Sequence, residues 1–216
     1  MLARETVITV IDFESTRVVP GYTDEPWQVG LVCVERGRLR PASRFSSLLR
    51  VGSRPFSRHA PGRHAALRGE IARAPALADL WPQMRARLEG GTLGAHNAAT
   101  EKKILRRAFP LHHFGPWVDT LKLVRMAYPA LASHKLDDLL PVLGLQGRAA
   151  KLAPRHAPHD ALFDAISAGL LLEHLMQLPG WEVVTVAALA AARPAEFHAR
   201  VAARRPRRLA NRSPLP

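Results

Sequence analysis

Cysteine is almost missing from this chain of 216 residues, which contains only Cys33. A single thiol excludes an internal disulfide framework and a zinc site built from four cysteines. Long apolar runs are missing as well, because no stretch approaches the roughly 18 apolar residues that a membrane span needs. The first residues also lack a basic segment followed by an apolar run and a small-residue cleavage site. These absences predict a protein of a reducing compartment, without a membrane segment, which we place in the cytoplasm.

Acidic residues are scarce relative to basic ones. The chain has 18 aspartates and glutamates against 31 lysines and arginines, which gives a formal net charge of +13. This balance favours a polyanionic partner, usually nucleic acid, although a solvated basic surface without a specific partner has the same composition. Hydrophobic residues make up 47% of the chain, which is enough to build a core and argues against global disorder.

The length fits one domain with extensions better than two full domains. We expect a main domain at residues 1–180 and a weakly helical extension at 181–203. The last residues, 204–216, contain five arginines and no acid, and they are expected to form a disordered basic tail.

The pattern of apolar and turn residues predicts strands first and mostly helices later. Strands are expected at 5–13, 26–40, 44–52 and 92–97. Helices are expected at 76–90, 98–109, 133–145 and 159–178. Segment 117–129 is expected to begin as the end of a strand and to continue as a helix. Segment 51–75 is expected to be mostly loop, with Asn97 and Ser133 as the N-caps of the helices that follow them. This order predicts an α/β fold in which helices flank a mixed sheet.

The first candidate site lies in "VITVIDFEST", residues 7–16, where an apolar strand ends in Asp12 and Glu14. Side chains alternate along a strand, so these two carboxylates share one face and repel each other. A divalent cation between them would remove the repulsion, and hard oxygen ligands suit Mg²⁺ or Mn²⁺. The simpler interpretation is a strand that ends at a solvated edge, and the spacing alone does not exclude it.

Two further groups of polar residues follow. In "HDALFDA", His159 begins a predicted apolar helix and Asp164 lies beside its apolar face. In "AHNAATEKKIL", Glu101 lies in the first turn of a helix that follows a strand. Each has an ordinary interpretation: a helix cap and an arginine partner in the first group, and an acid at a helix N-terminus in the second.

The order of these three motifs resembles that of the DEDDh 3′–5′ exonucleases, a family that includes the proofreading subunit of bacterial replicative DNA polymerase. "PWQVGLVCVERGRL" is similar to the family's second and third strands, and "VDTLKLVRMAYPALASHKLDDLLPVLGL" to the segment between its second and third motifs, including Asp119 and Thr120. The resemblance covers about residues 6–178. It implies a ribonuclease H-like fold, with a mixed five-stranded sheet and helices on both faces.

The resemblance also implies roles for individual residues. Asp12, Glu14 and Asp164 match metal ligands, Glu101 matches the second-motif acid at the metal site, and His159 matches the general base. Two divalent cations, Mg²⁺ or Mn²⁺, would activate water and stabilise the leaving 3′-oxygen. Histidine can accept the proton of the attacking water at neutral pH.

The sequence departs from the family in two places. Glu101 stands where the family usually has aspartate, and its extra methylene adds about 1.5 Å of reach. Ser15, Thr16 and Arg17 follow the first motif where the family often has Thr-Thr-Gly. We expect Ser15, Thr16, Arg17 and also Asn97 to contact the terminal nucleotide or its phosphate.

The expected function is hydrolysis of phosphodiester bonds at single-stranded or frayed 3′ ends of DNA, with release of nucleoside 5′-monophosphates. Two alternatives on the same fold remain: an exoribonuclease that trims RNA 3′ ends, and a non-catalytic nucleic-acid-binding module. A His-Asp pair at His159 and Asp160 also occurs in helical metal phosphohydrolases, but the strand-rich first half argues against their fold. The sequence does not identify a polymerase or repair partner.

Overall fold

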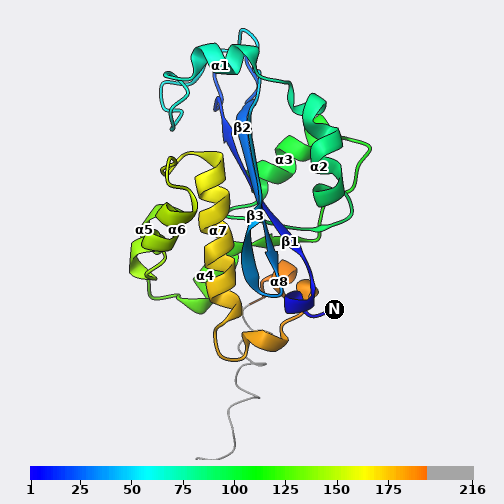
Figure 1. Ribbon diagram of the computed structural model, residues 1–216, viewed down its shortest axis with the longest axis vertical. Coiled ribbons are helices and arrows are strands. Elements are labelled where there is room, and N and C mark those ends of the chain that lie inside the picture. The colour runs from blue at the N-terminus through cyan, green and yellow to red at the C-terminus, as the bar shows by residue number, and fades with distance from the viewer. Residues whose placement is uncertain (194–216) are drawn as a thin grey trace, which may run out of the picture.

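The computed structural model describes residues 1–193. Five strands form one sheet: β1 (Ile8–Ser15), β2 (Pro26–Glu35), β3 (Arg38–Leu48), β4 (Thr92–Ala95) and β5 (Trp117–Asp119). The strand order is β3-β2-β1-β4-β5, with β2 antiparallel to β1 and β3, and β4 parallel to β1 and β5. The predicted mixed five-stranded sheet is confirmed, and β1 lies at its centre (Figure 1).

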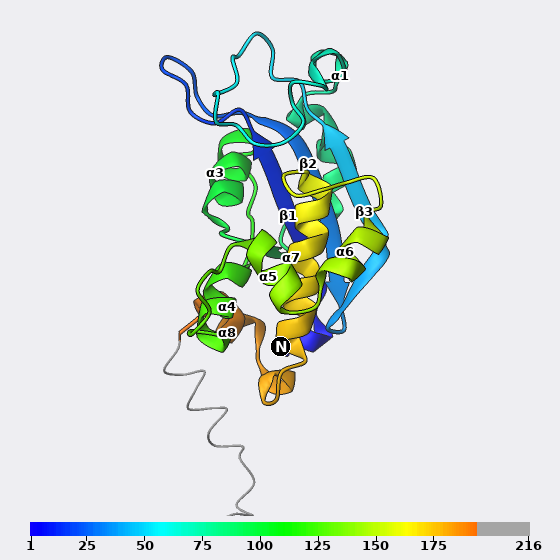
Figure 2. The same cartoon turned by 90° about the vertical axis from the view of Figure 1, so that its left-hand side faces the viewer.

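Helices cover both faces of this sheet. The helices are α1 (Arg68–Arg73), α2 (Trp81–Leu88), α3 (Ala99–Ala108), α4 (Thr120–Ala127), α5 (Leu136–Val142), α6 (Gln146–Leu152), α7 (Ala161–Met176) and α8 (Val186–Ala191). Short 3-10 turns lie at Ala3–Glu5, Leu77–Leu80 and Trp181–Val183. Helices α4 to α7 share a hydrophobic core with one face, and α2 and α3 share a core with the other (Figures 1 and 2).

Alternation along β1 decides which of its residues reach which core. Val10 belongs to the core under α7, whereas Ile11 and Phe13 belong to the core under α2 and α3. Asp12 and Glu14 have the same parity as Val10, so both carboxylates project from the α7 face at the end of the strand. This placement agrees with the shared face expected from their spacing.

The sheet and α7 lie very close together because two glycines stand where side chains would collide. A Cβ on Gly30 would lie 2.2 Å from the carbonyl oxygen of Ala161, and a Cβ on Gly169 would lie 2.8 Å from the side chain of Leu39. Gly30 pairs with Asp12 in the sheet. The close approach therefore brings the N-terminus of α7 onto β2 directly beside the carboxylates of β1.

Two predicted helix caps were wrong. Asn97 has a left-handed backbone (φ 66°), its N–H donates to Oδ1 of Asp119, and α3 has no side-chain cap. Ser133 lies before the cap position of α5, which is Lys135, and its hydroxyl donates to Oδ2 of Asp138. In both places a hydrogen bond to an aspartate in another element, Asp119 of β5 or Asp138 of α5, holds the chain instead of a cap.

Segment 51–75 is mostly loop, as predicted, and contains the short helix α1. Helix α6 was not predicted, and it packs against α7 through Ala149 in the core. Residues 181–193 include α8, whose Val186 and Leu189 join the same core as Val10. The rest of the predicted extension and the basic tail, 194–216, lie outside the described residues. Within residues 1–193, no helix combines the length and apolar character needed to cross a membrane.

Candidate active site

Four carboxylates from three elements meet at the C-terminal end of β1. Asp12 and Glu14 come from β1, Glu101 from the first turn of α3, and Asp164 from the first turn of α7. All four line one cavity of about 590 Å³, together with His159 from the loop before α7. The structure thus brings together the five residues that the three sequence motifs singled out.

Side-chain hydrogen bonds attach the N-terminus of α7 to β2. Gln28, which pairs with Glu14 in the sheet, accepts from the N–H of Ala161 at 3.2 Å and donates to Oδ2 of Asp160 at 2.9 Å. Oδ1 of Asp160 caps the helix by accepting from two backbone N–H groups of its first turn. These bonds fix the helical turn that carries Asp164, so Gln28 and Asp160 position the site without belonging to its carboxylate cluster.

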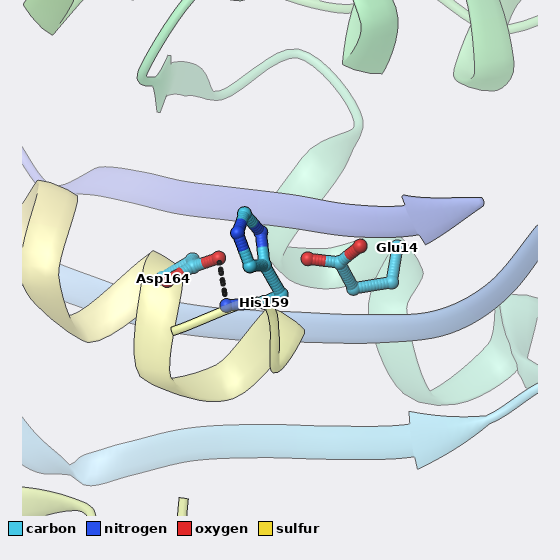
Figure 3. A group of neighbouring side chains, drawn as sticks. All are labelled: Glu14, His159 and Asp164. Carbon is cyan, nitrogen blue, oxygen red and sulfur yellow. Dashed lines mark hydrogen bonds between the residues drawn. The ribbon is translucent and has the colours of Figure 1, made fainter. Parts of the chain in front are cut away.

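Glu14, His159 and Asp164 form a tight group in the cavity (Figure 3). One potential ligand atom from each lies within 4.8 Å of the other two. The backbone N–H of His159 donates to Oδ2 of Asp164 at 3.1 Å, while the His159 side chain is 50% exposed. The backbone of His159 is left-handed (φ 65°), a conformation that costs an L-residue roughly 1–2 kcal/mol. The loop therefore holds the imidazole beside the carboxylates by keeping the backbone of His159 in a strained conformation.

Burial makes the ionised forms of these carboxylates costly. It raises the pKa of Glu14 from 4.5 to about 7, although the charge of Arg17 opposes the shift. It raises the pKa of Glu101 from 4.5 to about 8 and that of Asp164 from 3.8 to about 8. Burial, followed by repulsion from the neighbouring carboxylates, raises the pKa of Asp12 well above 3.8. Without a compensating cation, the cluster therefore holds protons at neutral pH.

Two carboxylate oxygens in the cluster are buried without a hydrogen-bond donor from residues 1–193: Oε2 of Glu101 and Oδ1 of Asp164. Glu101 is 3% exposed and Asp164 is 9% exposed, so solvent does not easily supply the missing partner. Grouped carboxylate oxygens are the ligands that Mg²⁺ and Mn²⁺ prefer. This donor set fits divalent cations, because they would satisfy both oxygens and remove the repulsion among the acids.

Three of the four residues expected to bind substrate line the cavity: Ser15, Arg17 and Asn97. Arg17 and Asn97 have left-handed backbones (φ 59° and 66°), a form of strain that is concentrated at functional sites. Thr16 is not brought to the cavity. It is 1% exposed, and its hydroxyl accepts the N–H of Glu25 at 3.0 Å, so this side chain holds the loop after β1.

One wall of the cavity was not identified from the sequence. It is segment 132–137, the end of the connection between α4 and α5 together with the first two residues of α5. His96 holds this segment, because its Nε2 lies 3.0 Å from the carbonyl oxygen of His134 and its Nδ1 lies 3.0 Å from the hydroxyl of Thr120. Burial lowers the pKa of His96, which keeps the ring neutral in this role. In the sequence, His96 of "AHNAATE" was the residue that could have indicated this wall.

Basic side chains surround the acidic cluster. Arg17, Arg125 and Lys135 line the same cavity. Cations bound by the carboxylates would add further positive charge in the interior. An anionic ligand such as a phosphate ester fits this arrangement, with a half-exposed histidine placed to accept a proton. The chemistry that these groups support is metal-assisted hydrolysis of a phosphate ester.

Comparison with known proteins gives consistent matches. A family model described as "Exonuclease" matches residues 9–172. A "DNA polymerase III subunit epsilon-like protein" of Rhodobacter capsulatus is 31% identical over 161 residues, which are 73% of this chain and 22% of that protein. "DNA polymerase III PolC-type" of Oceanobacillus iheyensis is 32% identical over 108 residues, 48% of this chain and 7% of that protein. The chain thus spans about a fifth or less of the length of these curated relatives.

Solved structures share the fold over most of the chain. Exonuclease X, in complex with 5′ overhanging duplex DNA, is 26% identical with a TM-score of 0.62, covering 85% of this chain and 99% of that one. The nuclease domain of 3′hExo, a DEDDh family member bound to rAMP, is 18% identical with a TM-score of 0.60, covering 85% of this chain and 97% of that one.

Proposed function

The chain belongs to the exonuclease family, of the DEDDh type, and from this premise we propose that it is an active 3′–5′ exonuclease acting on DNA. It would hydrolyse the terminal phosphodiester bond and release nucleoside 5′-monophosphates. The observation that carries the proposal is the gathering of Asp12, Glu14, Glu101 and Asp164 around one open cavity beside His159. A module that only binds nucleic acid has no need for four clustered acids, three of them buried, because they repel phosphate and cost folding energy.

Two divalent cations, Mg²⁺ or Mn²⁺, are the proposed cofactors. Asp12, Glu14 and Asp164 would hold them, and Glu101 would complete the site directly or through water. When bound, such ions supply charge for an attacking hydroxide and for the leaving 3′-oxygen. The carboxylates themselves must be deprotonated to bind, so the raised pKa values of Glu14, Glu101 and Asp164 make metal binding favour alkaline pH.

His159 is the proposed general base. One of its ring nitrogens would accept the proton of the attacking water, and the half-exposed ring could then release that proton to solvent. Asp137 Oδ2 lies 3.9 Å from Nε2 of His159, so a carboxylate faces this side of the ring. The left-handed backbone of His159 keeps the imidazole beside Glu14 and Asp164, where it could accept the proton of the attacking water.

Ser15, Arg17 and Asn97 are the proposed contacts for the 3′-terminal nucleotide. They line the cavity from two sides, after β1 and before α3. Arg17 can pair with a phosphate oxygen, whereas Ser15 and Asn97 offer hydrogen bonds to sugar or base. Thr16 is not among the proposed contacts, because its hydroxyl already accepts a hydrogen bond from the backbone N–H of Glu25.

DNA is favoured over RNA by the names of two relatives. The solved structure with 26% identity contains duplex DNA, and the relative with 31% identity is named after a DNA polymerase subunit. The neighbour bound to rAMP is 18% identical, which supports the fold alone. An RNA 3′-end activity on the same site is the second candidate.

The test is hydrolysis of matched DNA and RNA single strands, assayed with magnesium, with manganese and with chelator. We expect cleavage only with an ion present, and faster cleavage of DNA. Asp12→Asn should remove activity on both strands, because Asp12 lies among all three other carboxylates. Faster cleavage of RNA would favour the exoribonuclease alternative over the DNA exonuclease. Cleavage that persists in excess chelator would contradict the proposed metal site.

A further inference from the structure

Helix α3 separates charge between its two sides. Its inner side carries Glu101 into the active-site cavity, and its outer side carries four exposed cations: Lys102, Lys103, Arg106 and Arg107. On a helix, residues four apart are neighbours, so Lys102 lies beside Arg106 and Lys103 beside Arg107. Like charges at this spacing destabilise an isolated helix by about 0.2–0.5 kcal/mol per pair. The helix dipole favours Arg106 and Arg107 in the last turn, but it does not account for Lys102 and Lys103 near the start of α3.

These cations have few acidic partners. Arg107 pairs with Glu25, with Nη2 and Oε2 3.1 Å apart. Among residues 1–193, Lys102, Lys103 and Arg106 form no ion pair with a carboxylate. A polyanion would supply the missing negative charge.

The four cations line a groove of about 750 Å³, which we call the α3 groove. Its other wall is aromatic, with His113, Phe114 and Trp117, and within residues 1–193 no carboxylate lines it. Trp117 is held in place because its Nε1 donates to the carbonyl oxygen of Phe114 at 3.1 Å. The ammonium of Lys102 lies 5.6 Å from the centre of the Trp117 ring. Cationic side chains beside an anchored aromatic ring are the combination that binds single-stranded nucleic acid without sequence preference.

The α3 groove and the active-site cavity are linked by lining residues that each shares with a hollow beside α3. This smaller hollow of about 200 Å³ lies between them. It shares Thr100 with the active-site cavity, and it shares Ala99, Lys103 and Arg107 with the α3 groove. The same helix thus contacts the proposed site of hydrolysis through its first turn and the groove through the turns that follow.

We propose that the α3 groove binds the phosphate backbone of the substrate strand, at nucleotides that precede the one being removed. The inference rests on the proposed function for the identity of the strand. Lys102 and Arg107 are five residues apart, which is about 7.5 Å along the helix axis. That length is on the order of the separation of two neighbouring phosphates along an extended single strand, so the cations can contact about two phosphates. The groove would hold the strand while its end is in the acidic cavity, where the carboxylates alone would repel it.

The test compares two triple variants that remove the same charge. The first is Lys102→Gln, Lys103→Gln and Arg106→Gln, which keeps good helix formers at exposed positions and leaves the Arg107–Glu25 pair intact. The control is Arg4→Gln, Arg36→Gln and Arg40→Gln. These exposed residues lie near the opposite end of β1: Arg4 and Arg36 line a hollow together with Val7, and Arg40 pairs with Cys33, whose other partner is Thr9.

Binding to a thymidine strand of about 20 nucleotides is measured in chelator across a salt series, so that no hydrolysis occurs. The loss of two phosphate contacts lowers the slope of log affinity against log salt by about 1.4, which is about 25-fold in affinity at 0.1 M salt. The control triple should change neither quantity by more than a third as much. Equal slopes in the wild type and the α3 variant, or equal losses in both variants, would overturn the proposal.

Turnover of a dinucleotide separates this inference from the proposed function. A dinucleotide is too short to reach the α3 groove, so the α3 variant should hydrolyse it at the wild-type rate, while the KM for the long strand rises and its kcat stays unchanged. A similar loss on both substrates would mean that the cations act on the active site itself, and would overturn the groove. If the wild type hydrolyses neither substrate, the proposed function fails, and the salt slopes still decide whether the groove binds the strand.

Discussion

Replacing Glu101 by glutamine should change how the stability of the metal-free protein depends on pH. Burial raises the pKa of Glu101 from 4.5 to about 8, so the folded state retains a proton that the unfolded chain releases. The stability contributed by this group is therefore complete below about pH 4.5 and is lost as the pH rises towards 8. These two pKa values correspond to a loss of about 1 kcal/mol at pH 5 and about 4 kcal/mol at pH 8.

Glutamine has nearly the same shape and does not ionise, so Glu101→Gln removes this loss. The glutamine amide would also be buried where Oε2 of Glu101 now has no hydrogen-bond partner. An unpaired amide donor at this position costs about 1–3 kcal/mol at every pH. The absolute stabilities of the two proteins depend on that constant. The change in the free energy of unfolding between pH 5 and pH 8 is independent of that constant. Relative to the wild type, the variant should gain about 3 kcal/mol of stability over this interval.

The assay is urea unfolding of both proteins in chelator at several values between pH 5 and pH 8. Glu70→Gln on α1 is the matched control, because it makes the same chemical change at an exposed glutamate outside the carboxylate cluster. Parallel pH profiles for the wild type and Glu101→Gln would refute the reasoning, since they would mean that Glu101 ionises as easily in the folded state as in the unfolded chain.

The same substitution tests the role of Glu101 in turnover. Glutamine keeps the length and loses the charge, so turnover should fall at least about a hundredfold, or about 2.7 kcal/mol in barrier. Glu101→Asp keeps the charge and loses about 1.5 Å of reach, which a water molecule can fill. That variant should stay within about tenfold of the wild type. Full activity of Glu101→Gln would exclude Glu101 from catalysis.

Three further predictions concern other parts of the chain. His159→Asn, which tolerates the left-handed backbone, should lower turnover about 10²–10⁴-fold with little change in DNA affinity, whereas a loss of affinity alone would make His159 a binding residue. Gly30→Ala would place a Cβ 2.2 Å from the Ala161 carbonyl, so it should destabilise the fold by about 1–3 kcal/mol and reduce turnover, while Gly147→Ala, which has open space, should do neither. Deletion of 204–216, which contains five arginines, should weaken DNA binding and reduce its salt dependence. Unchanged binding would mean that this tail does not contact DNA.

The carboxylate cluster could be predicted because its parts follow local rules. Strand alternation put Asp12 and Glu14 on one face, and the motif order supplied Glu101, His159 and Asp164. Their assembly at one place depends on contacts that the local pattern does not reveal. The clearest example is the missing side chain at Gly30, which lets α7 lie beside the end of β1.

The predictions that failed concern loops, where hydrogen-bond partners come from distant segments. Asn97 was expected to cap α3, but its N–H donates to Asp119, which is 22 positions away. Thr16 was expected at the substrate, but its hydroxyl accepts the N–H of Glu25. The wall at 132–137 was missed for the same reason, because His96 holds it across the cavity. Propensity and spacing describe helices and strands, but they carry little information about such loop contacts.

A single experiment decides whether this protein removes nucleotides from the 3′ end with the help of bound cations. A DNA single strand labelled at its 5′ end and a second labelled at its 3′ end are incubated with the wild type or with Asp12→Asn, in magnesium or in chelator. The proposal predicts that the wild type in magnesium releases the 3′ label at once as a nucleoside 5′-monophosphate and shortens the 5′-labelled strand in single-nucleotide steps. It predicts no product in chelator or from Asp12→Asn. Immediate release of the 5′ label, or equal product from Asp12→Asn, would contradict it.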